Sequence, residues 1–201
     1  MSHKKITLGT RQKILEAGLQ LFSKKGYLGA TTKEIALRSG VAEVTVFRHF
    51  NSKEDLFEEV ISTYSFLPKL KELLADIKHI PYEKALTMIA GRFLEALQLR
   101  KDLIRIMHSE IRRYPHKIHV IYNSLIDGLI KTLSSYFRER QKIGELAGFD
   151  CESGARAFLG MFFSYFNAQE FLLQKRYAKI NDEKTTKEFV KIFINGTLRK
   201  E

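Results

Sequence analysis

The chain has 201 residues, of which 44% are apolar, so it is long enough for one or two domains with an apolar core and too apolar to be disordered. Its net charge of +11 favours polyanionic partners such as nucleic acid or an anionic membrane surface. The single cysteine excludes an internal disulfide, and we find neither a signal peptide nor an apolar run long enough to span a bilayer, so we expect a cytoplasmic protein.

The first quarter of the chain holds most of the positive charge. Residues 1–53 contain ten Lys and Arg against three Asp and Glu, a net charge of +7. Only three prolines and twelve glycines interrupt the whole sequence, and long stretches rich in Leu, Ile, Lys and Glu lie between them. This composition predicts an all-α fold.

Local signals at helix ends place the first helices. We expect one from Thr10, as N-cap, to Gly26, as C-cap, because its apolar residues recur at three- and four-residue spacing. A second should begin at Thr31, where TTKE matches a capping box, and end at Gly40. A third should run from residue 42 or 43 to about Phe50.

A connecting helix and a longer helical region should follow. Ser52 is the expected cap of the connecting helix, which Pro68 should bend or break near residue 66 or 67. The remaining helices are predicted at roughly 82–99, 102–113, 115–141, 152–175 and 183–199, with a loop at 143–150. The total is about nine helices.

The second and third helices, with a glycine turn between them, are typical of a helix-turn-helix, whose second helix enters the DNA major groove. On a helical wheel Val46 and Phe50 share one face and should pack inward. Val44, Thr45 and Arg48 lie on the opposite face and should point outward.

The outward side chains suit DNA chemically. Arg48 can donate two hydrogen bonds to guanine, Val44 can pack on a thymine methyl, and Glu43 can accept from cytosine N4. Phosphate contacts are expected from Thr45, His49 and Lys53, and from Thr32 and Lys33 at a helix N-terminus. The alternative is a solvated surface on a small helical module, which the basic surplus and the glycine turn disfavour.

Residues Arg11 to Phe57, and in particular ILEAGLQLFSKKGYLGATTKEIALRSGV and TVFRHFNSKEDLF, resemble the DNA-binding domain of the TetR (tetracycline-repressor) family. The resemblance implies a homodimeric transcription factor, usually a repressor, with a ligand-responsive C-terminal domain. It also implies DNA-backbone contacts by Thr32, Thr45, His49 and Lys53, and base contacts by Lys33, Glu43, Val44, Phe47 and Arg48.

The chain departs from the family pattern at three places. Ala42 stands where Ser is usual, Phe47 where Tyr is common, and Val44 where Gly is frequent. These differences leave the fold unchanged and alter the expected operator preference. We therefore predict a helix-turn-helix DNA-binding domain at residues 1–53, and a C-terminal regulatory, ligand-binding and dimerisation domain at residues 54–201.

A switchable regulator needs an effector site, because a ligand must bind its two states differently. Apolar side chains in the C-terminal helices could line one, although residues at helical spacing more often form core. The candidates are Phe93, Leu97, Met107, Ile111, Tyr122, Leu125, Ile126, Phe162, Tyr165 and Phe166. They favour a small apolar effector, such as a hydrophobic drug, a fatty acyl group or an aromatic compound.

Two C-terminal helices have the composition of a dimer interface. Residues 154–173 are apolar on more than one face, and small residues recur every fourth position. The resemblance implies a four-helix interface with the two-fold mates, which would place two reading helices on a near-palindromic operator. The candidate interface residues are Gly160, Ser164, Ala168, Phe189, Ile192, Phe193 and Gly196.

Other chemistries find little support. No GxSxG elbow, catalytic carboxylate pair or phosphate loop indicates an enzyme, and no amphipathic basic helix with exposed aromatics indicates membrane binding. His116 and His119 are three residues apart without a third metal ligand, so we expect no metal and no cofactor. Cys151 could be an oxidation sensor at a helix start, which its isolation disfavours. Activation in place of repression stays open.

Overall fold

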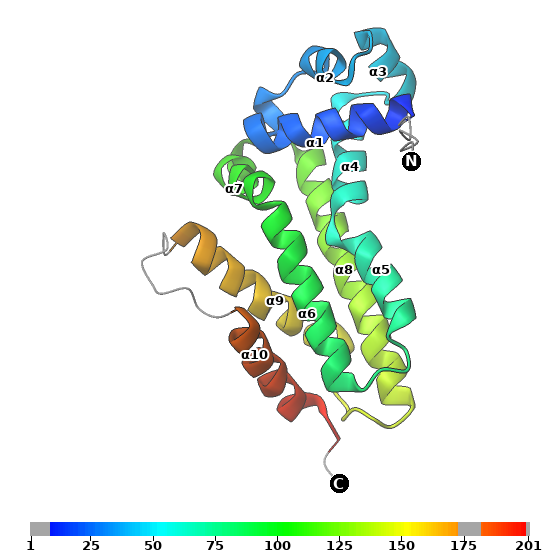
Figure 1. Cartoon of the computed structure of the whole chain (residues 1–201), viewed down its shortest axis with the longest axis vertical. Helices are drawn as coiled ribbons and strands as arrows, with labels where there is room; N and C mark the ends of the chain where they lie inside the picture. Colours follow the sequence, from blue (N-terminus) through cyan, green and yellow to red (C-terminus); the bar gives the residue numbers. More distant parts are fainter. Residues whose placement is uncertain (1–8, 173–181, 200–201) are drawn as a thin grey trace, which may run out of the picture. The chain divides into compact units, whose positions relative to one another are not determined.

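The structure is a computed structural model that describes residues 9–172 and 182–199. Within those ranges it contains ten α-helices, two short helical turns and no strand, which confirms the predicted all-α class (Figure 1). The contacts divide the chain into two compact units. Unit 1 comprises Met1–Tyr64 and Asp102–Tyr122, and unit 2 comprises Ser65–Lys101 and Asn123–Glu201. The functional boundary between residues 53 and 54 stays a prediction.

Unit 1 contains the N-terminal helices and a later helical hairpin. Its elements are α1 (Thr10–Gly29), α2 (Thr32–Ser39), α3 (Glu43–His49), α4 (Lys53–Tyr64), α7 (Lys101–Glu110), the 3-10 turn η1 (Ile111–Arg113) and the first residues of α8 (His116–Lys142). Figure 1 shows α2 and α3 side by side above α1.

Unit 2 contains the remaining helices. They are α5 (Phe66–Asp76), α6 (Tyr82–Leu99), the rest of α8, α9 (Cys151–Asn167), the π-helical turn η2 (Ala168–Leu172) and α10 (Asp182–Thr197). The predicted helix at 82–99 matches α6 at both ends, and the predicted loop at 143–150 separates α8 from α9. The last residues of the predicted helix at 152–175 lie outside the described residues.

The cap signals account for the start of the fold. The Thr31 side chain accepts a hydrogen bond from the Glu34 amide at 3.2 Å, and the Glu34 carboxylate accepts one from the Thr31 amide at 3.2 Å, which is the predicted capping box. Gly40 ends α2 with a φ of 72°. At α1 the N-cap is Gly9, one residue before the predicted Thr10.

Gly26 interrupts α1 instead of ending it. Its φ is +73°, a left-handed conformation that disfavours side chains, and helical turns resume as far as Gly29. A Cβ at this position would collide with the Glu110 carboxylate and with Ile106, both on α7. Position 26 thus needs glycine for two reasons, its backbone angle and the close approach of α7.

The break between α4 and α5 lies at Ser65, slightly before the predicted position. The Ser65 side chain accepts a hydrogen bond from the Leu67 amide at 3.3 Å and caps α5. Pro68 then occupies the first turn of α5, where its missing N–H leaves no helical hydrogen bond unmade. Splitting the expected connecting helix in this way raises the number of α-helices from nine to ten.

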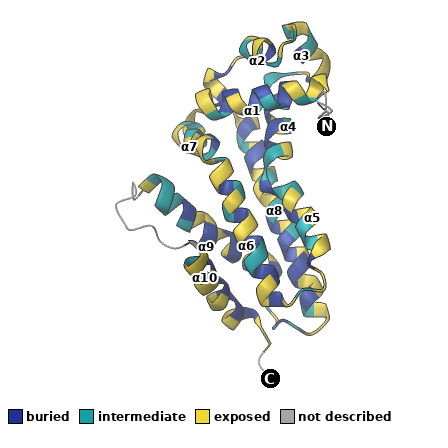
Figure 2. Ribbon diagram, viewed as in Figure 1, coloured by how far each residue is buried: buried dark blue, intermediate teal, exposed yellow. Residues whose placement is uncertain are grey.

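Each unit has its own aromatic core (Figure 2). In unit 1 the Phe57 ring packs edge-on against Phe22 at 4.9 Å and against Tyr122 at 5.8 Å, measured between centroids. In unit 2 Phe158 is fully buried and contacts Phe162 and Phe193, each at 5.1 Å. These clusters hold the surrounding helices in place.

A buried arginine organises one end of unit 2. Arg140 on α8 is only 7% exposed and pairs with Glu145 at 2.7 Å. Its guanidinium also donates to the backbone carbonyls of Ile77, Lys78 and Ile80, at 3.3, 3.2 and 2.8 Å. One side chain therefore satisfies three carbonyls of the loop between α5 and α6, which are otherwise costly to bury.

Candidate DNA-binding site

The inner face of α3 is clamped as predicted. Val46 is 1% exposed and Phe50, the residue that ends the helix, is 5% exposed. The Arg11 guanidinium lies 5.2 Å from the centroid of the Phe50 ring and covers it from α1. Ala42 makes no side-chain cap, so these packing contacts, more than local hydrogen bonding, fix the orientation of this seven-residue helix.

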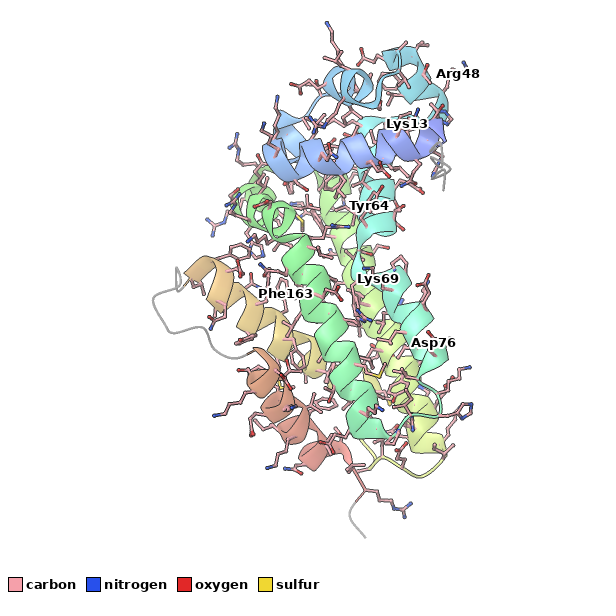
Figure 3. All side chains as sticks on the ribbon, in the orientation of Figure 1. Lys13, Arg48, Tyr64, Lys69, Asp76 and Phe163 are labelled. Atoms are coloured by element: carbon pink, nitrogen blue, oxygen red, sulfur yellow. The ribbon has the colours of Figure 1, made fainter. Side chains whose placement is uncertain are left out.

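The opposite face of α3 is open to solvent. Val44 is 67% exposed and Phe47 47% exposed, and Arg48 and His49 are also exposed, while Thr45 is half-buried (Figure 2). Figure 3 shows the Arg48 side chain at the outer edge of the helix. The predicted division of α3 into an inward and an outward face is therefore confirmed; the contacts of each residue with DNA stay predictions.

A hydrogen bond that the sequence reasoning missed ties α2 to α3. The Thr32 hydroxyl donates to a Glu43 carboxylate oxygen at 2.6 Å. The bond fixes the start of α3 to the start of α2 and occupies one of the two acceptor atoms that Glu43 could offer to a cytosine. Lys33, the next residue of α2, is exposed.

Lys53, a predicted phosphate contact, is partly enclosed by other side chains. It is half-buried at the start of α4, and its Nζ lies 4.4 Å from the centroid of the Tyr27 ring. Burial lowers the pKa of Lys53, and the carboxylates of Glu54 and Glu110 act in the opposite direction. The ammonium thus lies over the face of an aromatic ring.

Comparison of the chain with known proteins identifies its family. Residues 14–60 match the family model described as bacterial regulatory proteins, tetR family, and residues 84–196 match the model of the AefR-like transcriptional repressor C-terminal domain. The uncharacterized HTH-type transcriptional regulator YvkB of Bacillus subtilis is 30% identical over 187 residues, which cover 93% of this chain and 96% of that protein. The chain belongs to the TetR family of transcriptional regulators.

Solved structures agree with this regulator in fold. A protein from Mesorhizobium loti assigned to the TetR family superposes with a TM-score of 0.78 at 24% identity, over 94% of this chain and 97% of that chain. FadR from Bacillus subtilis, solved in complex with stearoyl-CoA, gives a TM-score of 0.73 at 18% identity, over 92% and 98%. The family consists of transcriptional regulators that bind DNA, so the prediction that the chain is no enzyme is confirmed.

The predicted effector residues of this TetR-family chain fall in both units. Met107, Ile111 and Tyr122 belong to unit 1, and Phe93, Leu97, Leu125, Ile126, Phe162, Tyr165 and Phe166 to unit 2. Most are buried or half-buried, and several pack on other rings, as Phe93 does on Phe66 at 5.2 Å. Ile111 and Ile126 are 38% and 50% exposed, unlike the enclosed surroundings expected of them. The pocket stays a prediction.

The predicted interface residues divide into an exposed set and a buried one. Gly160, Ser164 and Gly196 are exposed, and Ile192 is 61% exposed, whereas Ala168 and Phe189 are half-buried. The prediction for Phe193 needs correction. It is 8% exposed and packs on Phe137 at 5.6 Å and on Phe158, so it belongs to the core of unit 2.

Sequence reasoning missed Phe163 as part of the same surface. It lies on α9 between Gly160 and Ser164, is 37% exposed and projects from the helix in Figure 3. An aromatic next to small residues on an exposed helical face was the signal that could have found it.

Metal binding and oxidation sensing, the alternatives that the sequence disfavours, can be compared with the structure. Among the described residues no group of three or more His, Cys, Asp and Glu could hold a metal, and no helix there is long and apolar enough to cross a membrane. Cys151 is buried, and its thiol donates to the Gln141 side-chain oxygen at 3.0 Å. Burial raises the pKa of this thiol, the opposite of what an oxidation sensor needs.

Proposed function

We propose that this TetR-family chain is a repressor that binds a near-palindromic operator as a homodimer and is released by a small apolar effector. The observation that carries the proposal is the two-sided α3 helix. Val46 and Phe50 hold it from within, and Val44, Phe47 and Arg48 face solvent. An arginine beside two apolar side chains on such a helix suits direct readout of guanine and thymine in the major groove.

Phosphate contacts would set the register of the helix on DNA. Thr45 and His49 lie on or beside the exposed face of α3, and Lys33 is exposed on α2. Such side chains position a protein on the duplex without reading its sequence. The hydrogen bond from Thr32 already uses part of the acceptor capacity of Glu43 and fixes its side chain, so we assign Glu43 a smaller part in recognition than Arg48.

Repression and dimerisation rest on different support. The family model that matches the C-terminal region is named for a transcriptional repressor, and TetR-family regulators act as dimers. In this chain α9 presents Gly160, Phe163 and Ser164 to solvent, and α10 presents Ile192. A surface of small residues with scattered large apolar ones suits close packing of helices from a second copy, as a two-fold interface requires. Such a dimer would act in the cytoplasm.

The apolar effector is supported by the side chains of unit 2 and by one structural neighbour. The unit is rich in phenylalanine, and the FadR structure of Bacillus subtilis was solved with stearoyl-CoA. Likeness to that protein supports only the fold, so we place a long-chain acyl compound first in the panel to be tested rather than naming it as the effector.

The direct test is selection of bound duplexes from a random pool, followed by binding isotherms for Arg48→Ala. We expect that variant to lose about 1–3 kcal/mol on the selected operator and to relax preference at one base position. Arg92→Ala is the matched control, because Arg92 is an exposed arginine of unit 2 whose ion pair is with Glu95, three residues away on the same helix. Equal loss in both variants, or no selected sequence at all, would contradict the proposal.

The effector arm repeats the operator isotherm with lipophilic compounds of graded chain length, including acyl chains. Release that grows with apolar length supports the proposal, since burial of each CH₂ contributes about 0.8 kcal/mol. Release by charged, non-lipophilic compounds alone would overturn the apolar effector while leaving the DNA-binding function intact.

A further inference from the structure

The outer surface of α2 carries a leucine that contributes little to packing. Leu37 is 83% exposed, more than any other large apolar side chain in residues 9–172 and 182–199. The two residues before it, Ile35 and Ala36, are buried and form the inner face of the helix. A single exposed leucine is ordinary on a protein surface, so its meaning depends on which way this side of α2 faces.

Two contacts show which side of α2 faces α1. The Glu34 carboxylate pairs with the Lys25 ammonium, and the Arg38 guanidinium donates a hydrogen bond to the Gln20 side chain. Both of these partners belong to α1. Because successive residues are about 100° apart around a helix, Leu37 lies about 100° beyond Arg38 and about 60° beyond Glu34. Its side chain therefore projects away from the side of α2 that α1 occupies.

The same direction around α2 leads towards α3. Lys33 lies about 40° beyond Leu37, on the same stripe of the helix, and Thr32 lies about 100° further. The Thr32 hydroxyl bonds to Glu43 at the start of α3, so this side of α2 adjoins α3. Figure 1 shows α2 and α3 side by side above α1. Lys33 and Leu37 thus belong to the surface of unit 1 on which α3 presents Arg48.

We propose that Leu37 is a further DNA contact, which packs on the deoxyribose rings of the strand that borders the groove entered by α3. The inference rests on the proposed function and extends its site from α3 onto the outer stripe of α2. In a helix-turn-helix the first helix crosses the DNA backbone while the second enters the major groove. Leucine has no hydrogen-bonding group and is shorter than the neighbouring Lys33, which suits the carbon atoms of the sugars better than phosphate oxygens or base edges.

Such a contact has a signature that differs from those of phosphate-binding and base-reading residues. It neutralises no phosphate, so its loss should leave the slope of log affinity against log salt concentration unchanged. It touches no base, so its loss should weaken binding equally on all duplexes. Burial of each CH₂ group is worth about fourfold in affinity, and Leu37→Ala removes three carbons that one DNA strand covers in part, so the variant should bind about three- to tenfold more weakly.

Binding isotherms at several salt concentrations, on the selected operator and on a scrambled duplex, test the proposal. Leu99→Ala is the matched control, because Leu99 is a 59% exposed leucine of α6 in unit 2, and this variant should bind as wild type does. Leu37→Lys places an ammonium beside the backbone and should steepen the salt slope by about 0.9, whereas Leu99→Lys should leave the slope unchanged. Since both leucines are exposed, each variant should melt at the temperature of wild type.

A second measurement follows the leucine itself. In protein with ¹³C-labelled leucine methyl groups, the signal of Leu37 is identified by its absence from Leu37→Ala. It should shift on addition of the operator and give nuclear Overhauser contacts to deoxyribose protons, while the Leu99 signal stays in place. Contacts to a thymine methyl alone would mean that Leu37 reads a base, and would overturn its assignment to the backbone.

The outcomes separate the two proposals. If wild type selects no duplex, or if Arg48→Ala binds the selected duplex as tightly as wild type does, the proposed function fails and the inference with it. If Arg48→Ala weakens binding but Leu37→Ala binds as Leu99→Ala does, only the role of Leu37 is overturned. A Leu37→Lys variant with an unchanged salt slope, or a Leu37 signal that DNA leaves unmoved, would likewise overturn that role alone.

Discussion

Val44 and Val46 provide a matched pair of substitutions, two residues apart on one helix. Val46 is 1% exposed and Val44 is 67% exposed. Replacement of either by alanine removes the same two methyl-sized groups and makes the same small change in helix propensity. Any difference between Val46→Ala and Val44→Ala in stability therefore measures burial alone.

The two substitutions should change the free energy of unfolding by clearly different amounts. Val46→Ala loses burial of two carbons at about 0.8 kcal/mol each, and the cavity left behind adds to this, for a total of about 2–3 kcal/mol. Val44→Ala, already in solvent, should change the free energy of unfolding by less than about 0.5 kcal/mol. On DNA the order reverses, because loss of the exposed Val44 methyls should relax preference at one thymine position.

Urea unfolding followed by far-ultraviolet circular dichroism measures the stability difference, since the chain has no tryptophan for fluorescence. Native-state hydrogen exchange of the α3 amides shows whether the loss belongs to this helix. Binding isotherms on the selected duplex are read at a temperature where both variants are folded. Equal destabilisation by the two substitutions would refute the two-sided arrangement of α3.

Two further predictions concern unit 2. Arg140→Met should lose about 3 kcal/mol or more in urea unfolding, because three loop carbonyls and Glu145 lose their buried partner, whereas the exposed Arg138→Ala on the same helix should change stability by less than about 0.5 kcal/mol. Gly160→Leu should be monomeric by light scattering and Gly91→Leu dimeric: both glycines are exposed with open space around them, but only Gly160 lies on the proposed interface. A dimeric Gly160→Leu would exclude that surface.

Features set by neighbouring residues in the chain could be predicted from the sequence. The Thr31 capping box, the end of α2 at Gly40 and the inward Val46 each follow from spacing over a few residues, and all three are confirmed. The same local reasoning placed α6 correctly. It erred at Pro68, because a serine three residues earlier offered a better helix start than the proline itself.

Features set by residues far apart in the chain could not be predicted. The Thr32–Glu43 hydrogen bond needs the angle between α2 and α3, and the contact of Lys53 with the Tyr27 ring needs the placement of α4 against α1. Phe193 was assigned to the interface because it lies on the same side of its helix as Ile192 and Gly196, and only its packing against Phe137 shows that it points inward. Periodicity identifies an apolar face without saying what covers it.

The outer side chains of α3 pack little against the rest of the protein, and this has an evolutionary consequence. Val44, Phe47 and Arg48 contribute little to holding unit 1 together, because the helix is anchored by Val46, Phe50 and the Thr32–Glu43 bond. Substitutions at the three outer positions should therefore be nearly neutral for folding. A duplicated copy of this chain could drift towards a different target sequence through viable intermediates, without compensating changes elsewhere in the protein.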